Sequence, residues 1–140
     1  MHRAASPYRL PRDAVVQVAF VTDDAMRAAN SRFRGVDRAT DVLSFGEALP
    51  AGTKGAAAVP YIEARRPYNG GRFDLGELLI SLGQARRQAH KRGSPIVREV
   101  AFLAAHGILH LLGFEDETPA GYREMLGLGQ DATRQKSVKR

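Results

Sequence analysis

The sequence predicts an α+β fold, a single domain in which a small mixed β-sheet is covered by helices. Its 140 residues are 44% hydrophobic and 26% charged, the composition of one soluble globular domain with one core. The predicted elements follow the order strand, helix, strand, long loop, strand and then three helices, which favours one mixed sheet with helices packed on it. Val100–Phe114 is the longest apolar run and predicts a central buried helix. We assign residues 1–140 to one domain, with 1–13 and 130–140 expected to fray.

The first quarter of the chain predicts a strand followed by a helix. Ala14–Val21 is a run of Val, Ala and Phe, which indicates a buried strand. Thr22 is a suitable N-cap, and two aspartates follow it, where the helix dipole favours negative charge. A helix is therefore expected over Asp23–Phe33, ending near Gly35.

Two further strands are predicted on either side of a long irregular segment. Thr40–Phe45 and Leu75–Ser81 are rich in β-branched, aromatic and aliphatic residues, as strands are. Between them, Gly46–Asp74 contains three of the seven prolines and has neither helical nor strand periodicity. We therefore predict a long surface loop over residues 46–74.

Three helices are predicted in the second half of the chain. The first, Leu82–Lys91, is amphipathic and rich in Arg and Gln. Ser94 and Pro95 then offer a cap and a first-turn proline for the central helix, Ile96–Leu112. After an acidic turn, a last helix is expected over Thr118–Leu128.

The composition narrows the class of protein. The chain has no cysteine, which excludes disulfide frameworks, Cys-ligated zinc and thiol nucleophiles. The apolar run that ends at Phe114 is too short to span a bilayer, and the N-terminus lacks the apolar stretch of a secretory signal. We therefore expect a cytoplasmic protein that is neither exported nor membrane-spanning. The formal net charge of +6 favours anionic partners, nucleic acid above all.

Two histidines and an aspartate are the candidate metal ligands, and they place the site on the predicted central helix. His106 and His110 are spaced i, i+4, so both imidazoles point from one helical face. Gly113 permits the turn that returns the chain, and Asp116 follows within reach of both rings. Three such ligands leave a fourth position for water, the open arrangement of a catalytic zinc site.

A purely structural role for the histidines is the alternative. H-x3-H is short enough to recur by chance, and a histidine on an apolar face is usually a core residue whose hydrogen bonds are satisfied. However, two neutral imidazoles close together in a buried helix both need partners for their ring nitrogens, and one metal ion satisfies both at once. The spacing and the nearby acid therefore favour a metal site.

Four segments of the chain are similar to the motifs of a known family. His106–Phe114 reads H-G-I-L-H-L-L-G-F and resembles the signature H-G-x-L-H-L-x-G-[YF]-D-H. Asn30–Gly35 resembles N-x-x-[FY]-R-G, Thr40–Phe45 resembles T-D-V-L-S-F, and Leu75–Ile80 resembles L-G-[DE]-I-x-I. Together and in this order, these segments resemble the YbeY family of bacterial endoribonucleases.

The resemblance implies a metal-dependent hydrolase, a single-strand-type endoribonuclease that cleaves RNA phosphodiesters in rRNA maturation and ribosome quality control. It implies one divalent metal ion, Zn²⁺, with His106 and His110 as two of its ligands, and a functionally important arginine at Arg34. The partners that it implies are RNA, rRNA in particular, and the ribosome or ribosomal proteins. No membrane is involved, and the oligomeric state is left open.

The chain departs from the family pattern at the third metal ligand. The family has histidine six residues after the second ligand, and Asp116 occupies that position here. Aspartate is an ordinary zinc ligand, but its carboxylate lies closer to the backbone than the distal nitrogen of an imidazole. Either the turn moves inward, or the longer Glu115 or Glu117 or a water molecule serves instead, or the third ligand is lost and the site is weak.

Arg34 has both a structural and a functional interpretation. Most arginines are solvated surface charges, and Arg34 lies at the end of an amphipathic helix. The resemblance favours a catalytic role in which its guanidinium binds the scissile phosphate and stabilises the charge that develops on it. Asn30 either orients Arg34 or stabilises the helix end.

The mode of RNA binding is predicted from charge and from aromatic content. The helix over Leu82–Lys91 and the residue just beyond it carry four basic side chains: Arg86, Arg87, Lys91 and Arg92. The simplest interpretation is a solvated helix face, although some of these side chains can follow an RNA backbone. The chain has no Trp and only ten Phe and Tyr, so an aromatic stacking platform is unsupported. Phosphate contacts are the expected mode.

Two other functions compete with RNA cleavage. A zinc peptidase also carries H-x3-H on a helix, but it needs Glu as general base beside the first histidine, and that position is Gly107. The second is a non-catalytic RNA- or ribosome-binding protein that has the fold but a degenerate metal site. Metal content distinguishes it from the enzyme.

Overall fold

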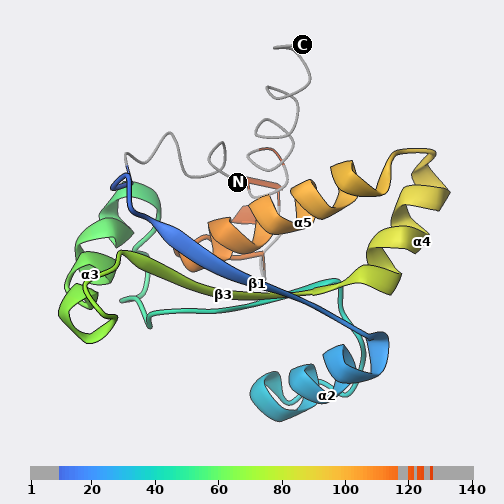
Figure 1. The fold of residues 1–140 in the computed structure, drawn as a ribbon, viewed down its shortest axis with the longest axis horizontal. Coiled ribbons are helices and arrows are strands. Elements are labelled where there is room, and N and C mark those ends of the chain that lie inside the picture. Colours follow the sequence, from blue (N-terminus) through green and yellow to red (C-terminus); the bar gives the residue numbers. More distant parts are fainter. Residues whose placement is uncertain (1–9, 117–119, 122, 125–126, 128–140) are drawn as a thin grey trace.

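The computed structural model describes residues 10–116, 120, 121, 123, 124 and 127. Its principal elements, drawn in Figure 1, are β1 (Val15–Val21), α2 (Asp23–Arg34), β2 (Val42–Phe45), β3 (Asp74–Ser81), α4 (Leu82–Arg92) and α5 (Ile96–Leu111). Their types and order confirm the predicted α+β fold. Thr22 caps α2 as expected, since its hydroxyl accepts a hydrogen bond from the N–H of Ala25 at 3.1 Å.

The three strands form one mixed sheet in the order β1-β3-β2. β1 is parallel to β3, whereas β2 is antiparallel to it. The central strand, β3, is the most apolar, and Leu75, Leu78 and Ile80 on it are buried. A strand that pairs on both sides and lies under a helix needs such a sequence.

β1 lies at an edge of the sheet. The strand predicted over Ala14–Val21 is therefore present, but the prediction that it is buried is wrong. The strand begins at Val15, and none of its residues is buried. Phe20 is 54% exposed. An apolar run predicts a strand, but the position of that strand in the sheet depends on its pairing with β3, which lies more than fifty residues away in the sequence.

α5 lies along one side of the sheet and forms the centre of the core, while α2 lies on the opposite side of the strands (Figure 1). Leu103, Ile108 and Leu109 of α5 are almost fully buried in one cluster with the apolar residues of β3. Gly107 allows a close approach, because a Cβ there would lie 2.6 Å from Cδ2 of Leu78. The central buried helix is thereby confirmed.

Residues 46–74 are more ordered than the predicted surface loop. They contain a 3-10 turn (Gly55–Ala58), the short helix α3 (Val59–Glu63) and a second 3-10 turn (Arg66–Tyr68). The segment also contributes three side chains to the main core: Ala58, Ile62 and Phe73. Helical pieces of three to five residues are too short to produce a periodic pattern in the sequence.

The junction between α4 and α5 differs by one residue from the predicted cap. Pro95 is extended, with φ −65° and ψ 144°, and is itself the N-cap, so α5 begins at Ile96. Ser94 does not cap the helix, and its hydroxyl is a buried group without a hydrogen-bond partner in the described part of the chain. Arg92 stabilises the junction instead, through an ion pair at 3.0 Å with the buried carboxylate of Glu99.

The last predicted helix, Thr118–Leu128, falls largely outside the described residues, although those described between 120 and 127 are helical. The tail 130–140 and residues 1–9 also lie outside them. Leu10, within the segment expected to fray, packs against the core. None of the described helices has both the length and the apolar composition that a membrane crossing requires.

Candidate metal centre

The last turns of α5 present both histidines on one face. His106 and His110 lie one turn apart, with ring centroids separated by 4.8 Å. Their side chains are 17% and 24% exposed, so the rings are mostly buried but accessible from solvent. Gly107, Ile108 and Leu109 between them are buried. Core packing of these three residues therefore fixes which face of the helix carries the histidines.

A tight turn at the end of α5 brings the chain back beside the histidines. Gly113 has φ +93°, in the left-handed region. Its N–H donates to the carbonyl of His110, and the N–H of Phe114 donates to the carbonyl of Leu109, which together form a Schellman motif. A side chain at Gly113 would overlap the carbonyl oxygen of Thr53. The predicted end of the helix at this glycine is confirmed.

This turn places the Asp116 carboxylate against both imidazoles. Oδ2 of Asp116 lies 3.4 Å from Nε2 of His106 and 3.4 Å from Nε2 of His110. The three ligand atoms all lie within 4.8 Å of one another. The side chain of Asp116 is 32% exposed, so the group opens toward solvent on one side. The structure therefore brings together the three residues predicted to bind metal.

The arrangement of these three atoms fits one small divalent ion. Two ligand atoms about 2.0–2.1 Å from a tetrahedral ion lie about 3.3–3.4 Å apart, and both histidine–aspartate distances are 3.4 Å. Two imidazoles and one carboxylate are ligands that zinc accepts, with one position left for water or substrate. The donor atoms and these two distances are thus compatible with a metal ion.

A backbone carbonyl orients the ring of His110. Nδ1 of His110 lies 3.1 Å from the carbonyl oxygen of Phe114, so Nδ1–H donates and Nε2 keeps its lone pair on the side of Asp116. Burial lowers the pKa of His110, and the charges of His106 and Arg34 lower it further. Both effects favour the neutral imidazole that binds metals. Residue type gives no signal for this acceptor, because every residue carries a backbone carbonyl.

The other two acids considered for the third ligand do not change this picture. The carboxylate of Glu115 lies against Gly121, where a Cβ would overlap Oε1, and the residue as a whole is exposed. Glu117 lies outside the described residues. The short side chain of Asp116 does approach both histidine rings, because the turn at Gly113 places its backbone beside them.

Arg34 is the last residue of α2 and is exposed. After burial and the charge of His106, its positive charge is the last of the causes that lower the pKa of His110. Within the described part of the chain, no carboxylate forms an ion pair with Arg34. α2 and α5 lie on opposite sides of the strands (Figure 1), so the structure does not bring Arg34 into contact with the three candidate ligands.

Asn30 stabilises the loop that follows α2. It is buried, its side-chain amide donates to the carbonyl of Arg38 at 2.9 Å, and its own carbonyl accepts from the N–H of Val36. Of the two roles open for Asn30, the contacts correspond to the structural one.

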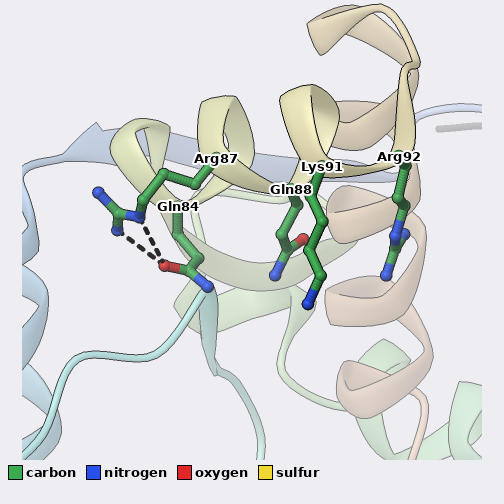
Figure 2. Close-up of a pocket in the computed structure, with 5 residues that line it drawn as sticks. All are labelled: Gln84, Arg87, Gln88, Lys91 and Arg92. Atoms are coloured by element: carbon green, nitrogen blue, oxygen red, sulfur yellow. Dashed lines mark hydrogen bonds between the residues drawn. The ribbon is translucent and has the colours of Figure 1, made fainter.

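The basic face of α4 borders a groove of about 480 Å³, lined by Gln84, Arg87, Gln88, Lys91 and Arg92 (Figure 2). Two of its three cations are already paired, Arg87 with Asp23 at 2.8 Å and Arg92 with Glu99 at 3.0 Å. Most of this charge is therefore neutralised within the protein, which agrees with the solvated-face interpretation.

The position that a zinc peptidase uses for its general base is closed. Gly107 faces β3, where a Cβ would lie 2.6 Å from Leu78, so a glutamate there would point into the core and away from His106. The peptidase alternative therefore fails on structure as well as on sequence.

The chain is similar to proteins of one family. The family model described as Endoribonuclease YbeY matches residues 1–136. Endoribonuclease YbeY of Moorella thermoacetica is 39% identical over 125 residues, which cover 89% of this chain and 74% of the relative. Endoribonuclease YbeY of Limosilactobacillus reuteri is 35% identical over 128 residues, which cover 91% and 77%.

The fold also has a solved counterpart. The solution structure of TM1509 from Thermotoga maritima matches with a TM-score of 0.53 at 21% identity, covering 99% of this chain and 79% of that one. The likeness at this level of identity concerns the fold alone. From the family match over nearly its whole length and from these relatives, the chain belongs to the Endoribonuclease YbeY family.

Proposed function

We propose that the protein is a metal-dependent endoribonuclease that hydrolyses phosphodiester bonds of single-stranded RNA. The observation that carries the proposal is the convergence of His106, His110 and Asp116, whose ligand atoms lie within 4.8 Å of one another at the end of a buried helix. Family membership supports RNA as the substrate, because the similar proteins are named endoribonucleases.

His106, His110 and Asp116 would hold one divalent ion, Zn²⁺ in this proposal. When bound, such an ion supplies Lewis acidity and lowers the pKa of a bound water. The protein's own part is to fix the ligands. The hydrogen bond from His110 to the carbonyl of Phe114 holds the ring in the tautomer that offers Nε2, as second contacts of metal ligands generally do.

Arg34 is the residue proposed to bind the scissile phosphate. A guanidinium matches two phosphate oxygens and stabilises charge that develops on them during displacement. Its exposure and its lack of a carboxylate partner among the described residues leave its donors available for substrate.

The cellular role follows from the same resemblance. We propose that the RNA is rRNA, that cleavage serves rRNA maturation and ribosome quality control, and that the ribosome or ribosomal proteins are partners. The compartment in this proposal is the cytoplasm, where that substrate is made and used. The basic net charge of +6 supports an anionic partner of this kind.

The decisive experiment measures metal content and RNA cleavage together in the wild type and in His110→Ala. The wild type is expected to hold one metal ion per chain and to cleave single-stranded RNA, and His110→Ala is expected to lose both. His90→Ala, an exposed histidine on α4, is the matched control and should change neither. Full metal content and full cleavage in His110→Ala would refute the assignment.

A non-catalytic RNA-binding protein is the second candidate. The observation that favours it is the aspartate where the family motif has histidine, which replaces a neutral ligand by an anion. A wild-type protein that binds RNA but neither retains metal nor cleaves would establish this candidate and reject the enzyme.

A further inference from the structure

We propose that Phe33 is a stacking site for one base of single-stranded RNA, next to the phosphate that Arg34 binds. The inference rests on the proposed function for the class of substrate. It adds a residue whose contact requires an unpaired base, and it departs from the expectation that phosphate contacts alone provide binding.

Phe33 is an aromatic side chain that the fold leaves in solvent. It is 61% exposed, although it lies in the last turn of α2, on a helix whose Met26 is fully buried. Its ring lies edge-on to the ring of Phe45, with centroids 5.2 Å apart and an interplanar angle of 70°. Phe45 is half-buried on β2, so one edge of the Phe33 ring is held by the sheet while much of its surface stays accessible.

An arginine contributes a second planar group to the same surface. The guanidinium carbon of Arg32 lies 5.3 Å from the Phe33 ring centroid, within the range of a cation–π contact. Aromatic rings and guanidinium planes are the two groups on which proteins stack unpaired bases. Arg32 and Phe33 therefore offer adjacent stacking surfaces on one helix turn.

The aromatic pair is connected to the metal centre through β2 and α5. Gly46 follows Phe45 and approaches α5 so closely that a Cβ there would lie 2.7 Å from Cδ2 of Leu111, the neighbour of His110. Arg34, the residue proposed to bind the scissile phosphate, directly follows Phe33 in the chain. We therefore expect a base at Phe33 to be one nucleotide away from the phosphate that Arg34 binds.

The charge around Phe33 suits a polyanion better than that of other surface patches. Arg32, Arg34 and Arg38 form no ion pair with a carboxylate among the residues that the structure describes, and Asp37 between them is already paired with Arg27 at 2.8 Å. The surface around the ring is thus effectively cationic.

Two other surfaces are weaker candidates by the same criterion. The α4 groove in Figure 2 has two of its three cations in ion pairs and carries no aromatic side chain. Tyr68 is 76% exposed and lies beside Arg65. However, Arg65 is paired with Glu47 at 3.1 Å, and this region lies beside α3, at the end of the molecule opposite α4 and separate from α2 (Figure 1).

The test uses fluorescence, because the chain contains no tryptophan. Phe33→Trp in the full chain introduces one fluorophore at the proposed stacking site, and Tyr68→Trp introduces one at an aromatic position that is still more exposed. Both variants are titrated with a uridine RNA 12-mer and with a duplex RNA of equal length, in a chelator and with one equivalent of Zn²⁺. Stacking is expected to quench Phe33→Trp strongly with the single strand only, and to leave Tyr68→Trp nearly unchanged.

Affinity provides the second measurement. Base–aromatic stacking contributes about 1–3 kcal/mol per base, so Phe33→Ala should weaken binding of the RNA 12-mer by roughly tenfold or more, while Phe33→Tyr should retain it. Thermal unfolding should change little in either variant, since the side chain is 61% exposed and its contact with Phe45 is one edge-on ring pair. Equal quenching at both positions, equal quenching by duplex RNA, or unchanged affinity in Phe33→Ala would overturn the proposal and leave the patch as a protein contact.

The two proposals fail separately. Stacking is measured in a chelator, where no cleavage takes place. If the single strand quenches Phe33→Trp selectively but the wild type shows no nuclease activity with metal, the role of Phe33 is supported and the enzyme is refuted. Normal cleavage with no selective quenching does the reverse.

Discussion

Asp116 stands where the signature that the chain resembles has a histidine, and its carboxylate lies 3.4 Å from both histidines. An anionic ligand donates more charge to a metal ion than a neutral imidazole does, so a water on that ion should have a higher pKa. Asp116→His should therefore shift the pH–activity profile toward lower pH. Asp116→Ala should weaken metal binding by at least about tenfold, more than loss of an outer contact costs.

These two variants are checked by metal titration and by cleavage rates across pH. Glu115→Ala, which changes the neighbouring exposed acid, is the matched control and should leave metal affinity intact. Unaltered metal content and pH profile in Asp116→Ala would show that Asp116 is a surface acid.

Arg34 is expected to act on substrate and not on folding. Arg34→Ala should lower the rate of RNA cleavage by about a hundredfold or more, a typical loss for a group that stabilises charge in the transition state. Arg34→Lys should recover little, because a point charge does not match two phosphate oxygens at once. Arg72→Ala, an exposed arginine in the loop before β3, is the comparison and should retain most of the activity. A melting temperature that falls with Arg34→Ala would indicate a structural role.

At the scale of elements, the end of α5 decides whether the metal ligands meet. Gly113 combines φ +93° with a backbone oxygen of Thr53 at the position of a Cβ. Gly113→Ala should therefore lower the free energy of unfolding by more than the about 1–2 kcal/mol that a left-handed conformation alone costs. It should also weaken metal binding, because the turn that carries Asp116 has to move.

Gly93→Ala separates the cost of a left-handed backbone conformation from the cost of a steric overlap at the Cβ position. Gly93 at the end of α4 also has a positive φ, +64°, but no atom lies within 4 Å of the position of its Cβ. This variant should lose about 1–2 kcal/mol of stability and bind metal normally. Equal losses in the two variants, measured by thermal unfolding and metal titration, would mean that the contact with Thr53 is unimportant.

At the scale of the whole molecule, one carboxylate connects the starts of two helices. Asp23, at the start of α2, accepts hydrogen bonds from the hydroxyl of Ser81 at 2.7 Å and from Arg87 of α4 at 2.8 Å. The hydrogen bond from Ser81 and then that from Arg87 lower the pKa of Asp23 below its usual value of 3.8. The unfolded chain therefore binds this proton more tightly than the folded one, so the stabilisation is present above about pH 4 and is lost as the pH falls further.

Thermal unfolding measured from about pH 6 to about pH 3 tests this linkage. Asp23→Asn should lower the melting temperature at the upper end and flatten its decline in acid, whereas Asp24→Asn, an exposed neighbour in the same turn, should follow the wild type. A parallel decline in the wild type and Asp23→Asn would assign the acid sensitivity to other carboxylates.

The sequence by itself determined the features that depend on near neighbours along the chain. Thr22 and Gly113 mark helix ends because caps and left-handed turns are settled within a few residues. The i, i+4 spacing of His106 and His110 places both rings on one face for the same reason. Most helix and strand boundaries were predicted within one or two residues on this basis.

Only the tertiary structure decided the features that depend on distant partners. β1 is an edge strand and not a buried one because of what pairs with it, and Ile62 is a core residue because a non-periodic segment folds back onto α5. Asp116 lies beside the histidines because the chain turns back at Gly113, a turn against which the backbone of Thr53 packs. Such contacts join residues tens of positions apart, and their formation depends on which surfaces can be buried together, a property of the assembled chain and not of any local pattern.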